Sequence, residues 1–143
     1  MKPFSLHTVL SYRKRLEDIA KNRLFEAQTE KQKVQDKLTE EENGYTQLLV
    51  TLERLQTEGI DILDLIRYED QILFTKNRII SIKKTLSEKI ARVANEREHL
   101  IQRSKERKIM EKLKEKQNQS WQEYLNKKEA ALLDEIAIIF HDK

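Results

Sequence analysis

Apolar side chains recur along the first sixty residues in alternating steps of three and four, the spacing that keeps one stripe on one side of a helix. From Leu24 to Leu55 the stripe occupies ten positions, eight of them apolar. Its members are Leu24, Ala27, Lys31, Val34, Leu38, Glu41, Tyr45, Leu48, Leu52 and Leu55. The pattern predicts a long helix that packs one narrow face against a partner helix.

The same alternation runs upstream at Leu6, Val9, Arg13, Leu16 and Ala20. Joining it to the downstream stripe takes two successive four-residue steps, from Leu16 to Ala20 and from Ala20 to Leu24. Such a stutter predicts a local unwinding of the supercoil in this part of the helix.

A second stripe begins after residue 62 and predicts the returning partner helix. Thr75 interrupts it, and a second stutter falls between Leu86 and Ile90. Residues 95–120 are far more polar, with eight basic and five acidic side chains, so the helix should continue with a weak seam. The stripe comprises Leu65, Tyr68, Ile72, Ile79, Ile82, Leu86, Ile90 and Val93, and a further apolar stripe near the C-terminus comprises Trp121, Leu125, Leu132, Leu133, Ile136, Ile139 and Phe140.

The chain reverses near Gly59. Glycine closes a helix in the left-handed conformation, the following Ile60 can pack back on the last turn, and Asp61 can cap the next helix. Ser5 is the candidate cap of the first helix. Gly44 falls inside a strong heptad run. We expect it to be tolerated within the helix, because glycine destabilises a helix by only about 1 kcal/mol relative to alanine.

These elements predict an all-α fold, an antiparallel coiled-coil hairpin of two long helices, the second longer. We expect one elongated domain, 1–143, with a helix over about 5–57, a turn at about 58–61 and a helix over about 62–140. At 1.5 Å per residue the helices measure roughly 80 and 120 Å. Residues pair where their numbers add to about 120, so the chain beyond about 117 has no partner arm.

Composition agrees with this fold class. The 143 residues include no cysteine, two glycines and one proline, and 37% are charged. So few turn-forming residues exclude sheet architectures. Apolar residues amount to 38%, enough for a narrow seam between helices.

Charge excludes two classes of partner. The net charge is +3, divided as 0 for residues 1–59, +2 for 60–94 and +1 for 95–143. Binding to nucleic acid or to a membrane surface requires concentrated cations, and no segment of the chain carries such an excess of one sign. No stretch approaches the roughly 20 apolar residues that cross a bilayer, and the N-terminus does not resemble a signal peptide, so we expect no membrane insertion and a cytoplasmic location.

Nothing in the sequence predicts an enzyme, a cofactor or a metal site. The pairing rule brings none of His7, His99 and His141 together. Paired acids such as Asp134 and Glu135 lie on helices with no pocket to shift their pKa. Two glycines cannot build a phosphate-binding loop.

Two groups of residues are candidate docking surfaces, each with a structural alternative. Tyr45, Tyr68 and Phe74 near the turn either widen the seam or form an aromatic patch for a partner. A basic group on the second arm either is a solvated face or binds an acidic partner. It comprises Arg103, Lys105, Arg107, Lys108, Lys112, Lys114 and Lys116, and the pairing rule brings Arg13, Lys14 and Arg15 to the same end.

Several segments resemble the flagellar export protein family FliJ. These are the N-terminal FSLHTVLSYR, the turn at Gly59-Ile60, and the C-terminal run MEKLKEK at residues 110–116 followed by Tyr124, Glu129, Leu133-Asp134-Glu135 and Ala137. The resemblance covers nearly the whole chain. It implies an antiparallel coiled coil similar to the central stalk of rotary ATPases, within the flagellar type III export apparatus.

The resemblance also implies partners and sites. The end with both termini would enter the hexameric export ATPase ring through Arg13, Lys14, Arg15, Lys112, Lys114 and Lys116, and the export gate membrane protein would contact Tyr45, Tyr68 and Ile72. Substrate chaperones are further implied partners. The protein would promote the ATPase without catalysis of its own, either free in the cytoplasm or peripheral at the inner membrane.

The alternative function is a structural or chaperone-like coiled coil of another system. The equivalent rod of a virulence type III secretion machine is one such case, with the same hairpin serving different partners.

Overall fold

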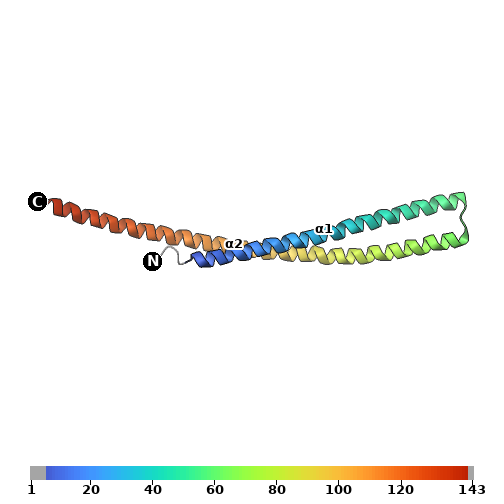
Figure 1. Ribbon diagram of the computed structural model, residues 1–143, viewed down its shortest axis with the longest axis horizontal. Helices are drawn as coiled ribbons and strands as arrows, with labels where there is room; N and C mark the ends of the chain where they lie inside the picture. Colours follow the sequence, from blue (N-terminus) through green and yellow to red (C-terminus); the bar gives the residue numbers. More distant parts are fainter. Residues whose placement is uncertain (1–5, 142–143) are drawn as a thin grey trace. The chain divides into compact units, whose positions relative to one another are not determined.

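The computed structural model describes residues 6–141, and within this range the chain forms two helices and no strand. Helix α1 spans His7–Glu58 and α2 spans Ile62–His141. The helices pack against each other as antiparallel arms joined by a short turn, and the second is the longer (Figure 1). The predicted helical hairpin is confirmed. The expected cap at Ser5 lies outside the described residues.

Gly59 ends α1 as predicted, and Asp61 directly precedes the first residue of α2. Gly59 has a φ of 102°, in the left-handed region where a side chain would be strained. The Leu65 backbone nitrogen donates to the Asp61 carbonyl at 3.0 Å, which places Asp61 at the N-cap position of α2. Gly44 lies within α1, as predicted.

The seam of α1 is confirmed from Leu24 to Leu55, where all ten predicted positions are buried or half-buried. Upstream of Leu24, four of the five predicted positions are buried or half-buried, but Val9 is exposed and the predicted stutter is wrong. Leu6, Leu10, Arg13, Glu17 and Ala20 are shielded and continue the three-and-four alternation without a stutter, and Leu16 beside them is half-buried. Val9 is 41% exposed, whereas Leu10 is 5% exposed and Glu17 is 6% exposed. The apolar spacing favoured Leu16 over its neighbour because the seam position between Arg13 and Ala20 is occupied by a carboxylate, that of Glu17.

A similar correction applies to α2. Lys89, not Ile90, is shielded between Leu86 and Val93, so the predicted stutter is absent. The alternation then continues to Trp121 through the polar stretch that we expected to be weak. The shielded positions there are Glu96, Leu100, Arg103, Arg107, Met110, Lys114 and Gln117.

Contacts divide the chain into two units. The hairpin unit comprises residues 22–98, and the described part of the open-end unit comprises residues 6–21 and 99–141. The hairpin unit has an apolar core in which Leu38 packs against Ile79 and Ile82. Ion pairs also join its arms, from Glu41 to Arg78 at 2.6 Å and from Glu30 to Arg92 at 2.6 Å.

The open-end unit packs differently. Its buried apolar side chains are Leu10 and Ala20, and between them lies Glu17, which is the buried charged residue of this part of the described chain. Ion pairs from Arg13 to Glu106 and from Arg107 to Glu17 join the two arms of this unit beside these apolar contacts. The numbers of the residues in the pairs between arms add to between 119 and 124 in both units, in agreement with the predicted register.

Candidate docking surfaces

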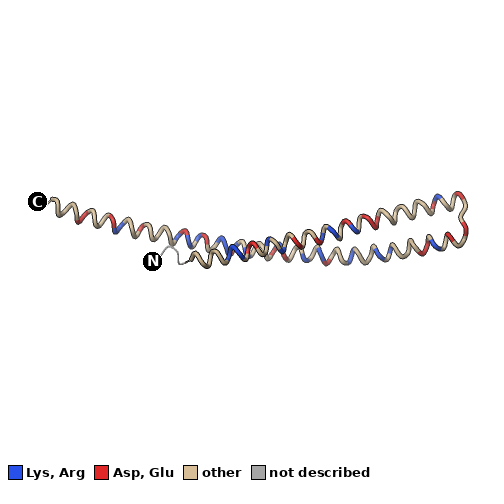
Figure 2. Tube along the Cα trace, viewed as in Figure 1, with Lys and Arg blue, Asp and Glu red and all other residues tan. Residues whose placement is uncertain are grey.

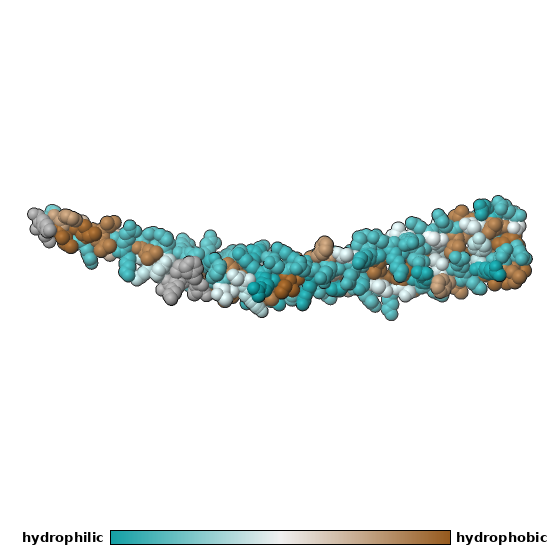
Figure 3. Space-filling model, in the orientation of Figure 1, coloured by the Kyte–Doolittle hydropathy of each residue, from teal (hydrophilic) through white to brown (hydrophobic). Residues whose placement is uncertain are grey.

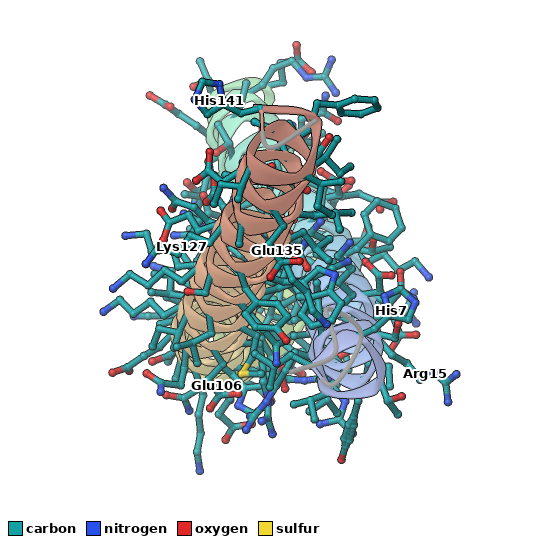
Figure 4. All side chains as sticks on the ribbon, turned by 90° about the vertical axis from the view of Figure 1, so that its left-hand side faces the viewer. His7, Arg15, Glu106, Lys127, Glu135 and His141 are labelled. Carbon is teal, nitrogen blue, oxygen red and sulfur yellow. The ribbon has the colours of Figure 1, made fainter. Side chains whose placement is uncertain are left out.

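Lysine and arginine gather on both helices of the open-end unit (Figure 2). Four of the six cations predicted to contact the ATPase ring are exposed, namely Lys14, Arg15, Lys112 and Lys116. The side chain of Arg15 points away from α2 (Figure 4). These four are available to an acidic partner.

The remaining two predicted cations are engaged within the unit. Arg13 is half-buried, and its Nη1 lies 2.8 Å from Oε2 of Glu106, an oxygen that also accepts from Arg103 at 3.1 Å. Lys114 is half-buried with its Nζ 3.4 Å from Nδ1 of His7. Arg13 and Lys114 therefore join the two arms.

The pair of Glu17 and Arg107 was not predicted from the sequence. The Arg107 Nε lies 3.1 and 2.9 Å from the two carboxylate oxygens of Glu17, and its Nη1 donates to Glu111 at 2.7 Å. Burial raises the pKa of Glu17, but hydrogen bonds from Arg107 and Ser104 and the nearby cations outweigh it, so the pKa of Glu17 lies below its ordinary value. A strict heptad continued upstream from Ala20, without a requirement for apolar side chains, would have found it.

The end of α2 forms what we call the tail, residues 122–141. Every residue of the tail is exposed, including its large apolar side chains. Just before it, the Trp121 ring stacks on that of Tyr124 with centroids 5.6 Å apart. Brown apolar surface is visible along this end of the molecule (Figure 3). The exposed apolar residues of the tail are Tyr124, Leu125, Leu132, Leu133, Ile136, Ile138, Ile139 and Phe140.

The three residues predicted to contact the export gate lie in the seam of the hairpin unit. Tyr45, Tyr68 and Ile72 are each half-buried, and Tyr45 packs against the core around Leu38 and Ile79. A partner would therefore reach them only at the edges of the seam.

A groove beside this seam offers such an edge. It has a volume of about 680 Å³, and Gly44 and Thr75 on facing arms leave it open, because neither has a bulky side chain. Tyr68 and Phe74 line it, and Arg78 lies 5.8 Å from the centroid of the Phe74 ring. Glu40 and Glu41 also line the groove, and Glu41 pairs with Arg78 at 2.6 Å. The groove thus combines aromatic surface with a paired cation and two carboxylates.

Exposed apolar side chains also surround the turn, where brown surface is visible (Figure 3). They belong to both arms and comprise Leu49, Val50, Ile62, Leu63, Ile66 and Leu73. From the sequence, only the aromatic residues Tyr45, Tyr68 and Phe74 were predicted as a patch near the turn, and these aliphatic residues were not.

No helix in the range 6–141 has a stretch long and apolar enough to span a membrane. The family model described as "Flagellar FliJ protein" matches residues 1–142. Neither the curated proteins nor the solved structures contain a match to the chain.

Proposed function

The chain belongs to the family of flagellar FliJ proteins and so to the flagellar export apparatus, and we propose that it binds the hexameric export ATPase and promotes its activity as a stalk-like rod. Residues 1–143 act as one elongated coiled-coil domain in this proposal. The end with both termini faces the ring, and Lys14, Arg15, Lys112 and Lys116 supply the contacts.

The observation that carries this proposal is the arrangement of charge in the open-end unit. Residues 6–21 contain four Lys or Arg against two acids, and residues 99–121 contain seven against three, a combined net charge of +6. Ion pairs use Arg13 and Arg107 to join the arms, but the four exposed cations have side chains open to solvent. An excess of positive charge of this kind favours association with an acidic pore lining.

Arg13 and Lys114 have a different role in this proposal from the one the sequence suggested. Because both are half-buried and contact the other arm, they hold the docking end together. The exposed cations beside them then make the contacts with the ring.

We propose that the export gate binds at the groove between Gly44 and Thr75. Tyr68 lines this groove, Tyr45 lies at the adjoining edge of the seam, and Ile72 is on the same seam. The aromatic rings of Tyr68 and Phe74 suit a partner with apolar side chains. Export chaperones remain proposed partners without an assigned surface.

The family is a non-catalytic export component, and we assign the chain no chemistry of its own. We propose that it works in the cytoplasm, free or peripheral at the inner membrane. The matched family is flagellar, which favours this system over a virulence-type machine.

The test measures the ATPase rate and ring assembly of the purified export ATPase with and without this protein at low salt. We expect stimulation by the unmodified chain. The double variant Lys14→Glu, Arg15→Glu should weaken binding by at least about tenfold, because it reverses two exposed cations.

The matched control is Lys33→Glu, Lys37→Glu, which makes the same change of charge at exposed positions of α1 in the hairpin unit. It should bind like the unmodified chain. Equal loss in both variants would show a general charge effect and would contradict docking by the open end, as would an absence of stimulation and binding.

A further inference from the structure

The first turns of α1 carry two stripes, and the more apolar one faces outward. The inward stripe contains Arg13 and Glu17 between Leu10 and Ala20. The outer stripe consists of Val9, Tyr12, Leu16 and Ile19, again in steps of three and four. Val9, Tyr12 and Ile19 are 41%, 54% and 43% exposed, and Leu16 is half-buried. This is the reverse of an ordinary amphipathic helix, whose apolar stripe is buried.

Cations border the outer stripe on both sides. One shallow groove on it is lined by Val9, Tyr12 and Leu16 together with Arg13 and Arg103. A neighbouring groove shares Tyr12 and Leu16 and ends at Arg15. Arg13 and Arg103 both pair with Glu106, so Arg15 is the cation of this surface that an occupant can reach. An occupant would therefore be apolar in the middle and acidic at the edge beside Arg15.

The tail of the same chain has these properties. Leu125, Leu132, Ile136 and Ile139 follow helical spacing on one side and are 39–58% exposed. Glu129 and Glu135 lie on opposite edges of this stripe, at about +40° and −80° from Leu125 at 100° per residue. The tail contains two Lys against four acids, a net charge of −2. The part of the unit where the two arms pair, residues 6–21 and 99–121, has a net charge of +6.

A chain cannot place its tail on its own outer stripe while α2 stays helical. Lys114 lies beside His7 at the start of α1, so the tail, which begins eight residues later, continues past that start. Figure 1 shows the red end of α2 running on beyond the blue end of α1. Two chains related by a twofold axis can each place a tail beside the α1 of the other, which is a closed, self-complementary arrangement.

We propose that the outer stripe of α1 binds the tail of a second copy of this chain, so that two open-end units form a dimer. Each tail lies parallel to the α1 helix of its partner and adds a third helix to the pair there. Apolar contact between the stripes holds the dimer, and Arg15, beside Tyr12 and Leu16, meets the glutamates along the tail. The proposal does not depend on the proposed ATPase docking, because it concerns the chain alone.

The first experiment is sedimentation equilibrium of the purified full chain over about two decades of concentration, since dimer formation follows mass action. We expect a monomer–dimer equilibrium that shifts toward monomer at high salt. Leu132→Asp should raise the dissociation constant at least about tenfold, because it places a charge in the middle of the interface.

Ala130→Asp is the matched control, since it adds the same charge to an exposed position about 140° around the tail helix from Leu125. It should change the dissociation constant by less than about twofold. Circular dichroism should be the same for both variants. A purely monomeric chain, or equal effects of the two variants, would overturn the proposal.

The second experiment locates the contact by disulfide formation, for which the absence of native cysteine is an advantage. A mixture of Tyr12→Cys and Leu132→Cys chains should give a disulfide-linked heterodimer. In the control mixture Asp18→Cys, at an exposed position on the far side of α1, replaces Tyr12→Cys. This mixture should give no disulfide-linked heterodimer. If one chain carrying both Tyr12→Cys and Leu132→Cys forms an internal disulfide at monomeric mass, the tail folds back on its own chain and the dimer is excluded.

Discussion

Glu17 and Arg107 form an ion pair across the seam of the open-end unit, with the arginine Nε 3.1 and 2.9 Å from the two carboxylate oxygens. The Glu17 side chain is 8% exposed and that of Arg107 is 21% exposed. Buried pairs of this kind contribute little net stability compared with apolar packing, but removal of one partner is costly. The pair therefore fixes which residues of the arms face each other more than it strengthens the seam.

Arg107→Ala should destabilise the chain by about 1–3 kcal/mol, because it leaves the buried Glu17 carboxylate without its main donor. The double variant Glu17→Leu, Arg107→Leu should recover this loss, since two apolar side chains suit a heptad seam. Urea unfolding followed by circular dichroism measures both. A double variant less stable than Arg107→Ala would mean that the pair itself stabilises the seam.

Stability should fall in acid. The pKa of Glu17 lies below its ordinary 4.5 because bonds from Arg107 and Ser104 outweigh burial. Hydrogen bonds from Lys89 and Arg92 lower the pKa of Glu30, and a bond from Arg103 lowers that of Glu106 despite desolvation. Groups with a lowered pKa contribute stability above their unfolded pKa and lose it as the pH falls through the folded one.

We therefore expect the urea midpoint to be nearly constant from about pH 7 to about pH 5.5 and to decrease below about pH 4.5. The difference between the unmodified chain and Arg107→Ala should narrow in acid, because protonation of Glu17 relieves the unpaired buried charge in the variant. A midpoint that rises on acidification would contradict the assigned contacts.

The fold followed from the sequence because heptad spacing and turn chemistry are local signals. Leu38 stands at the expected place in a series of apolar residues three and four apart. Gly59 stands at the end of α1, where the turn requires a residue in the left-handed conformation. The register followed as well, since a single turn fixes which positions oppose each other. Glu41 and Arg78, whose numbers add to 119, form an ion pair at 2.6 Å.

The arrangement of the open-end unit could not be predicted in the same way. Counting apolar side chains favoured Val9 and Leu16 as seam residues, since aliphatic residues are normally buried. The structure places Leu10 and Glu17 inside, where a carboxylate is shielded because Arg107 on the other arm pairs with it. Such pairing is a property of two helices together, so the spacing within one helix marks position 17 only when an apolar side chain is not required there. Partner binding by Lys14, Arg15 or Tyr68 is likewise a property of two molecules.

The two glycines should respond to alanine with opposite signs. Gly44→Ala should stabilise the chain by about 0.5–1 kcal/mol, because an added Cβ has no atom within 4 Å and glycine is a poor helix residue. Gly59→Ala should destabilise it by about 1–2 kcal/mol, because its φ of 102° is unfavourable for any side chain. Thermal unfolding of the two variants compares them directly. A stabilising Gly59→Ala would mean that the turn has another conformation.

The adjacent residues Val9 and Leu10 test the corrected seam of α1. Leu10→Asp should cost about 3 kcal/mol, because it replaces a side chain that is 5% exposed with a buried charge. Val9→Asp should change stability by less than about 0.5 kcal/mol, because Val9 is 41% exposed. Urea unfolding at a concentration low enough to keep the chain monomeric separates this effect from self-association. A larger loss for Val9→Asp than for Leu10→Asp would support the stuttered register that apolar spacing alone predicts, and would exclude Glu17 from the seam.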